Sequence, residues 1–143
     1  MTTLSGGKIG YVHIRQMDEA NFRTTIDKVD GRNRNKKALI IDSRFNTGGN
    51  LHQQLVEFFS KSTDIVARPQ GHYYIQDSQP DGSYKPTCLL ISEQNYSDGF
   101  NFPYLYQRKG LGKLIGAPVA GTGVLWEQQL DKTLTIGYPQ LGL

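Results

Sequence analysis

The chain has 143 residues, of which 37% are hydrophobic and 20% are charged, which predicts one globular domain with its own core. The 16 Lys and Arg against 13 Asp and Glu give a formal net charge of +3, too small to predict a nucleic-acid partner. A single cysteine, Cys88, excludes an internal disulfide. No run approaches the roughly 18 apolar residues of a membrane span, so no membrane partner is expected.

The first half of the chain is predicted to alternate strands and helices. Residues 8–14 form a β-branched and aromatic run, typical of a strand. An apolar stripe of helical period then runs from about residue 18 to Gly31, where the helix is expected to end. Residues 38–42 are largely apolar and predict a strand buried on both faces of a parallel sheet. A second helix is predicted at about 51–61.

The second half repeats the pattern. A strand at 73–75 and a turn cluster at 77–82 are followed by a buried strand at 87–92, a polar turn at 93–99 and a helix at about 101–109, with further short strands at 113–117 and 134–138. In the helix at 101–109, Pro103 fits if it falls in the first turn. Strands that alternate with helices predict an α/β fold with a mainly parallel sheet.

Two turns are candidate functional sites because, in such sheets, sites lie at the carboxyl ends of the strands, where the chain turns into a helix. Gly48-Gly49 leads directly into a helix, and paired glycines can present backbone N–H groups to an anion. This makes the turn a candidate oxyanion hole or phosphate nest, although a tight turn is the plainer reading. No Gly-Lys-Ser/Thr sequence follows, so the turn is not a P-loop.

Ser97-Asp98-Gly99 also stands between a buried strand and a helix. A serine at this place can be displayed above the sheet as a nucleophile, assisted by nearby backbone N–H groups. The alternative is a turn or N-cap serine whose hydroxyl bonds backbone amides. The residues alone leave both readings open.

Three segments in one order carry a resemblance to a known family. They are Lys-Ile-Gly-Tyr-Val-His-Ile at 8–14, Ile-Ile-Asp-Ser-Arg-Phe-Asn-Thr-Gly-Gly-Asn at 40–50, and Ser-Asp-Gly-Phe-Asn-Phe-Pro-Tyr running into Gly-Leu-Gly-Lys-Leu-Ile-Gly over 97–116. Together they resemble the tricorn-type branch of the tail-specific, or C-terminal processing, serine peptidases. The resemblance implies an α/β fold of the Clp-protease/crotonase type, a spiral of strand-strand-helix units with a mainly parallel sheet.

The resemblance also implies roles for individual residues. Ser97 would be the catalytic nucleophile, the backbone N–H groups of Gly49 and Asp98 would form the oxyanion hole, and Gly48 would bind substrate. The Asp98 side chain need not take part. No metal and no cofactor are implied, and the expected substrate is a peptide or an unfolded protein that binds as an extended strand.

The sequence departs from the family pattern at one informative position. Many tail-specific proteases activate the serine with a lysine in a Gly-Lys-Gly turn, where this chain has Gly121-Thr122-Gly123. A Ser–Lys dyad is therefore not expected, and the resemblance favours a tricorn-like arrangement of Ser, His and Glu. In that branch the histidine and the glutamate come from segments not recognisable here.

The histidines of this chain are interpreted as structural. His13 is expected to be packed or hydrogen bonded within its strand, and His52 and His72 to be exposed, with no orienting acid in their sequence context. Glu127 is the nearest candidate acid in the C-terminal part, although a carboxylate on a solvated strand face is the plainer reading.

These expectations make residues 1–143 a single domain, read as an excised part of a peptidase catalytic core that is inactive by itself. Homo-oligomerisation of the parent protein is left open, as is a cytoplasmic or a periplasmic location. A non-catalytic module of the same fold that binds an apolar ligand or a peptide is the first alternative. A crotonase-like enzyme ranks below it, since nothing in the sequence suggests an adenine-nucleotide pocket.

Overall fold

The computed structural model describes residues 5–60, 66–67, 75–76, 85–121 and 125–139. In chain order its elements are β1 (Ile9–His13), α1 (Glu19–Asp30), β2 (Ala38–Asp42), α2 (His52–Phe59), β3 (Val66–Ala67), β4 (Ile75–Gln76), β5 (Thr87–Ile91), α3 (Asp98–Arg108), β6 (Gly112–Gly116), β7 (Leu125–Gln129) and β8 (Thr135–Pro139).

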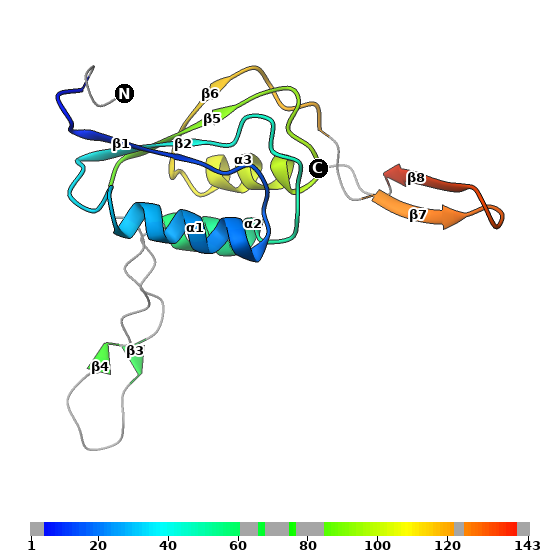
Figure 1. Cartoon of the computed structure of the whole chain (residues 1–143), viewed down its shortest axis with the longest axis horizontal. Helices are drawn as coiled ribbons and strands as arrows, with labels where there is room; N and C mark the ends of the chain where they lie inside the picture. Colours follow the sequence, from blue (N-terminus) through cyan, green and yellow to red (C-terminus); the bar gives the residue numbers. More distant parts are fainter. Residues whose placement is uncertain (1–4, 61–65, 68–74, 77–84, 122–124, 140–143) are drawn as a thin grey trace.

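The centre of the fold is a four-stranded sheet in the order β1-β2-β5-β6, with every neighbouring pair parallel. Parallel neighbours require a crossover, and α1 and α3 each supply one, between β1 and β2 and between β5 and β6. The three helices lie on one side of this sheet (Figure 1). The predicted α/β class with a mainly parallel sheet is confirmed.

The hydrophobic core lies between the sheet and the three helices. Alternate strand residues point toward the helices, because successive side chains in a strand face opposite sides. The strands contribute Val12, Leu39, Ile41, Leu89 and Ile91, and the helices contribute Val29, Leu55, Val56, Phe58, Phe59, Phe102 and Tyr106. All of these side chains are at most 7% exposed, so this layer is closed to water.

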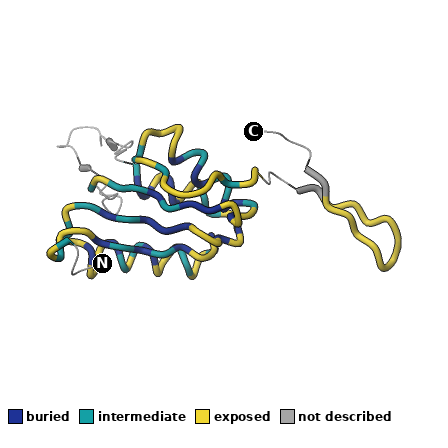
Figure 2. The backbone as a smooth tube through the Cα atoms, turned by 90° about the horizontal axis from the view of Figure 1, so that it is seen from above, coloured by how far each residue is buried: buried dark blue, intermediate teal, exposed yellow. Residues whose placement is uncertain are grey.

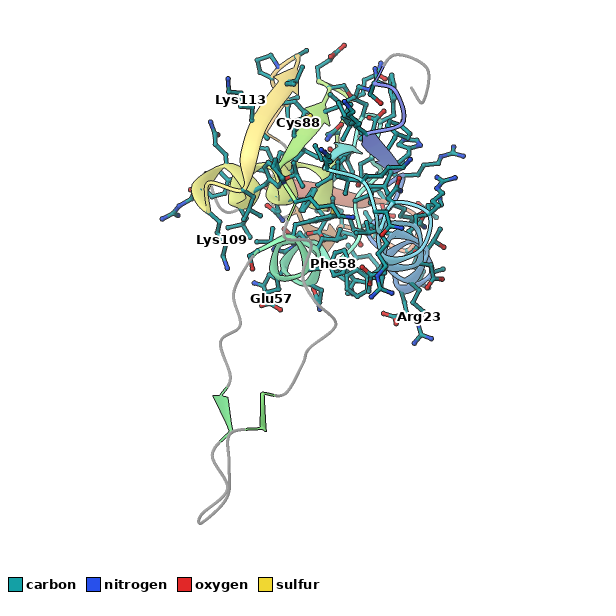
Figure 3. All side chains as sticks on the ribbon, turned by 90° about the vertical axis from the view of Figure 1, so that its left-hand side faces the viewer. Arg23, Glu57, Phe58, Cys88, Lys109 and Lys113 are labelled. Carbon is teal, nitrogen blue, oxygen red and sulfur yellow. The ribbon has the colours of Figure 1, made fainter. Side chains whose placement is uncertain are left out.

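The other face of the sheet is less well covered. Tyr11, Ile40 and Cys88 lie in register across it and are only half-buried, and Ile115 is 51% exposed. Figure 2 shows buried residues along the middle of the strands, and Cys88 lies on the sheet well apart from Phe58 on α2 (Figure 3). The prediction that the strand at 38–42 is buried on both faces is therefore wrong, because all three described helices cover the same face.

Both ends of α1 agree with the sequence. Asp18 is its N-cap, and the Asp18 carboxylate accepts a hydrogen bond of 2.8 Å from the Asn21 N–H. Gly31 follows the last residue, and its N–H donates to the Asp27 carbonyl at 2.9 Å. The second predicted helix, at about 51–61, is shorter than expected and ends at Phe59.

Helix α3 begins at Asp98, three residues before the predicted start at 101. Pro103 consequently lies in the helix interior rather than in its first turn, where it cannot donate the usual hydrogen bond to the Gly99 carbonyl. The Asn95 side chain supplies the missing donor, since Asn95 Nδ2 donates to the Gly99 carbonyl oxygen at 3.1 Å. This repair lets the helix start directly behind Ser97.

Two antiparallel strand pairs accompany the sheet. Strands β7 and β8 form a hairpin that projects beyond the sheet, and β8 corresponds to the strand predicted at 134–138 (Figure 1). Strands β3 and β4 are two residues each; Ile75 alone of the strand predicted at 73–75 is described, and the turn at 77–82 lies outside the described residues. No helix within the described residues is long and apolar enough to cross a membrane.

Candidate active site

The two turns singled out from the sequence lie against each other at the carboxyl ends of β2 and β5. The strands are parallel neighbours, so both chains leave the sheet at the same edge. The Tyr96 N–H donates to the Asn46 carbonyl at 2.9 Å, joining one turn to the other. An added Cβ on Gly99 would lie only 3.0 Å from the Asn46 carbonyl oxygen, which shows how closely the turns pack.

The glycine turn is held in a conformation that side chains disfavour. Gly48 has φ +95° and Gly49 has φ +144°, both in the region that glycine alone adopts readily. Asn46, which is fully buried, accepts the Gly48 N–H on Oδ1 at 2.8 Å and donates from Nδ2 to the Ile14 carbonyl at 2.8 Å. The turn is thereby tied to the segment that follows β1.

A backbone bridge to Met17 fixes the other side of the glycine turn. The Met17 N–H donates to the Gly48 carbonyl at 2.8 Å, and the Asn50 N–H donates to the Met17 carbonyl at 3.0 Å. A Cβ on Gly49 would lie 2.1 Å from the Met17 carbonyl oxygen, so only glycine fits. The Gly49 N–H takes no part in this bridge.

Ser97 occupies the residue before α3 in a strained conformation. Its φ of +52° and ψ of −120° are unusual for a residue with a side chain, and its hydroxyl does not cap the helix. The glycine turn lies directly against it: a Cβ on Gly48 would be 2.8 Å from the Ser97 Cβ and 3.3 Å from the Ser97 Oγ. Ser97 therefore holds the N-cap position of α3 without a side-chain cap.

Asp98 begins α3 and turns its carboxylate toward α2. The side chain is 6% exposed, accepts the His52 N–H on Oδ2 at 3.1 Å, and accepts Asn101 Nδ2 on Oδ1 at 3.2 Å. The Nδ1 atom of His52 lies 2.6 Å from the Asp98 Oδ1, although the pair is not aligned for a hydrogen bond. As the first residue of α3, Asp98 has an N–H with no acceptor within the helix.

The expectation that His52 is exposed is wrong, and an acid lies beside it that its sequence context does not contain. Its side chain is 22% exposed and lies against the Asp98 carboxylate. Sequence context could not show this, because 46 residues separate the two and only the β2–β5 pairing brings their helices together.

The remaining candidates from the sequence take no part in this constellation. His13 is half-buried, and its Nε2 lies 3.4 Å from the Arg44 carbonyl oxygen, so it is hydrogen bonded as predicted. Glu127 is exposed on β7, also as predicted. His72 and Thr122 lie outside the described residues, and among those described no three His, Cys, Asp or Glu side chains gather as a metal site requires.

A charged network supports the first turn from the open face of the sheet. Asp42, at the end of β2, accepts two hydrogen bonds from the Arg44 side chain, at 2.9 and 2.7 Å, and one from the Tyr11 hydroxyl at 2.7 Å. Burial alone would raise the pKa of Asp42, but these bonds lower its pKa to about 2. Burial and the bond to Asp42 raise the pKa of Tyr11. Asp42 thus stays ionised and fixes Arg44 at the start of the turn.

Comparison with known proteins gives one family and one fold. The model of peptidase family S41 matches residues 8–141. The tricorn protease of Thermoplasma acidophilum is 30% identical over 122 residues, which are 82% of this chain and 11% of that protein. Across the curated relatives it matches, the chain spans between 10% and 16% of their length.

Solved structures agree with the sequence comparison. A crystal structure of the tricorn protease superposes with a TM-score of 0.66 at 26% identity, covering 90% of this chain and 12% of that one. The photosystem II D1 C-terminal processing protease superposes with a TM-score of 0.59 at 20% identity, covering 84% of this chain and 33% of that one. This second likeness is one of fold, and it supports the predicted fold class.

Proposed function

The chain belongs to peptidase family S41, and from that premise we propose that it carries the nucleophile half of a serine peptidase active site. Ser97 attacks the peptide carbonyl and forms an acyl-enzyme, and the N–H groups of Gly49 and Asp98 stabilise the oxyanion. Gly48 lines the place where the substrate carbonyl binds. The substrate is an unstructured polypeptide.

One observation supports the proposal most strongly: Ser97 is strained at the start of a helix, with the glycine turn against its hydroxyl. Backbone strain on this scale costs of order 1–3 kcal/mol and is found mostly at functional sites. A structural serine in the same turn would cap the helix and needs neither positive φ nor a glycine beside its Oγ.

The chemistry follows from this arrangement. When the Ser97 Oγ bonds to the carbonyl carbon, the C=O electrons move onto oxygen and the hydroxyl proton passes to a base. The intermediate collapses with release of the amine, which takes that proton, and water then hydrolyses the ester. Each backbone N–H aimed at the oxyanion contributes about 3 kcal/mol to the transition state.

We propose further that the base lies in another segment of the full protein. The Nε2 atom of His13 lies against the Arg44 carbonyl oxygen, which supports this for His13. His52 holds an acid at Nδ1, as a catalytic histidine also does, so the activity of residues 1–143 alone tests His52 as the base. A serine hydroxyl without a base within hydrogen-bond reach is a poor nucleophile at neutral pH. Residues 1–143 alone are therefore expected to fold without turning over peptide.

The test compares the full-length protein with its Ser97→Ala variant on an unstructured peptide and with a fluorophosphonate probe. The wild type should cleave the peptide and be labelled at Ser97, and the variant should do neither. Ser60→Ala is the matched control, because the Ser60 hydroxyl bonds the Glu57 carbonyl at the end of α2, and it should behave as wild type. An active Ser97→Ala variant would reject the assignment.

The same experiment separates the peptidase from its first alternative. A non-catalytic module of this fold, holding an apolar ligand or a peptide, would neither cleave nor react with the probe. Preference for unfolded segments is a further expectation, because an extended substrate binds through main-chain hydrogen bonds. It is checked by comparing cleavage of one domain in its folded and denatured forms.

A further inference from the structure

The Asp98 carboxylate serves the N-termini of two helices at once. It belongs to the first residue of α3, and it accepts the N–H of His52, the first residue of α2. Helix α2 needs this acceptor, since its N-cap Leu51 makes no side-chain cap and its first turn contains no acidic residue. A negative charge at this end of a helix is favourable to both the free N–H groups and the macrodipole.

From this geometry we propose that Asp98 and His52 are a positioning pair that keeps the two oxyanion donors at a fixed separation. The proposal rests on the proposed function, and it gives the Asp98 side chain a role in addition to that of its backbone N–H. Neither side chain is placed on the reacting atoms. Both act through the backbone to which they are attached.

The path from the pair to the donors is short on each side. The Asp98 N–H and the carboxylate belong to the same residue. A shift of the Asp98 side chain therefore also turns the Asp98 backbone N–H. The Gly49 N–H lies three residues before His52. The intervening turn is fixed at its beginning by the Met17 bridge and at its end by the bond from the His52 N–H to Asp98.

Burial explains why the pair needs both members. A carboxyl group that is 6% exposed is costly to bury unless its oxygens are hydrogen bonded. His52 provides the backbone N–H and, 2.6 Å away, its ring Nδ1, while Asn101 provides a third polar contact. Removing the ring takes away a polar atom in close contact with the carboxylate but leaves its two hydrogen bonds, from the His52 N–H and Asn101 Nδ2. The carboxylate then shifts, and the start of α3 tilts with it.

The experiment uses the full-length protein with His52→Leu, His52→Asn and Asp98→Ala, measured below the unfolding temperature of each variant. His52→Leu removes the polar ring, whereas the Asn side chain can place an N–H where Nδ1 stands. Misplaced oxyanion donors act on the transition state, so kcat should fall about 10- to 100-fold in His52→Leu while KM changes less than about threefold. His52→Asn should recover kcat to within about threefold of wild type.

The affinity of a peptide aldehyde inhibitor distinguishes positioning of the oxyanion donors from a purely structural role, which would not change that affinity. Ser97 Oγ adds to the aldehyde carbon, and the adduct places its oxygen in the oxyanion hole. His52→Leu and Asp98→Ala should weaken the aldehyde by about the factor lost from kcat, and should leave the affinity of the corresponding peptide amide unchanged. Gln53→Ala, an exposed neighbour on α2, is the matched control.

Three results would overturn the pairing. A His52→Leu protein with wild-type kcat, or with a change confined to KM, would show that the pair does not align the donors. A His52→Asn protein as inactive as His52→Leu would identify His52 as a proton carrier instead. If wild type neither cleaves peptide nor is labelled at Ser97, the proposed function itself fails and this inference with it. Asp98→Ala unfolding does not affect the His52 comparison.

Discussion

The turns after β2 and β5 begin alike and continue differently. Each strand is followed by a Ser-x-x-Asn sequence, Ser43 to Asn46 and Ser92 to Asn95, and in each the Asn N–H donates to the Ser carbonyl at 3.1 Å. The serines and asparagines also bond across: Asn95 Nδ2 reaches Ser43 Oγ at 3.3 Å. We call each hydrogen-bonded Ser-x-x-Asn turn a frame, Ser43 to Asn46 being the first and Ser92 to Asn95 the second. The two frames therefore support each other.

The difference begins after the asparagine. The first turn continues into glycines that expose backbone, and its Asn46 side chain binds that backbone directly. The second continues into Ser97 and a helix, and its Asn95 side chain repairs the bond lost at Pro103. Under the proposed function, the first turn offers a backbone N–H group and the second a hydroxyl, so the same Ser-x-x-Asn sequence leaves the residues that follow it free to differ.

The largest effect should come from giving the glycine turn a side chain. In Gly49→Ala the new Cβ would meet the Met17 carbonyl oxygen at 2.1 Å, with φ at +144°, so we expect a loss of about 4 kcal/mol or more in unfolding free energy. Gly110→Ala is the control, because its φ is +64° but its surroundings are open. It should cost only about 1–2 kcal/mol. Equal losses in urea denaturation would show that backbone strain alone requires glycine in this turn.

Removing each asparagine tests whether both frames matter equally. Asn46→Ala leaves the Gly48 N–H and the Ile14 carbonyl without this hydrogen-bond partner, and Asn95→Ala does the same to the Gly99 carbonyl. All three groups are buried. Unpaired buried groups cost about 1–3 kcal/mol each, so we expect losses of about 3 kcal/mol for Asn46 and about 2 kcal/mol for Asn95. The exposed Gln107→Ala on α3 should stay within about 0.5 kcal/mol. The reverse order for the two asparagines would contradict this comparison.

Local sequence patterns predict the strands that precede the two turns, but they do not predict the contacts between the turns. The apolar runs predict the strand at 38–42 with its observed bounds and the strand at 87–92 to within one residue, because a short apolar run between turns is a local signal. The start of α3 was missed, since the cost of Pro103 inside a helix is offset by Asn95, a residue outside that helix. The strain at Ser97 has no local signal either.

The contact of Asp98 with His52 depends on strand order, which no local pattern contains. Knowing that parallel neighbours end at one edge could have brought the two turns together, and the expectation of a shared site used that rule. The pairing of these two side chains needed the helix orientations as well. The same limit explains the open face of the sheet, because apolar strand residues read alike whichever element covers them.

The stability of the two turns should respond differently to pH. Asp42 precedes the first turn, and its partner in the sheet register before the second turn is the apolar Leu90. The pKa of Asp42 is about 2 when folded and near 3.8 when unfolded, so its stabilisation is present above pH 4 and is lost as pH falls through 2. Asp42→Asn should cost up to about 2 kcal/mol at neutral pH, and its deficit should shrink on acidification. A deficit that stays constant from pH 7 to pH 2 would contradict the assigned pKa.

The smallest effect should come from Tyr11→Phe, which removes one of the bonds that anchor the first turn. The Tyr11 hydroxyl donates to Asp42 Oδ2 at 2.7 Å, and the two Arg44 side-chain bonds remain in the variant. One hydrogen bond to a charged group contributes about 1.5–3 kcal/mol at most. Because Tyr11 is only half-buried, water can replace its hydroxyl, so we expect a loss of about 1 kcal/mol in unfolding free energy.

The pKa of Asp42 should rise from about 2 toward its ordinary value in Tyr11→Phe, because a donor to the ionised form is gone. Carboxyl chemical shifts followed against pH measure this directly. The acid-induced loss of stability should then begin at higher pH than in wild type, by the same interval as the pKa. A Tyr11→Phe protein with an unchanged Asp42 titration would show that Arg44 alone sets the charge that anchors this turn.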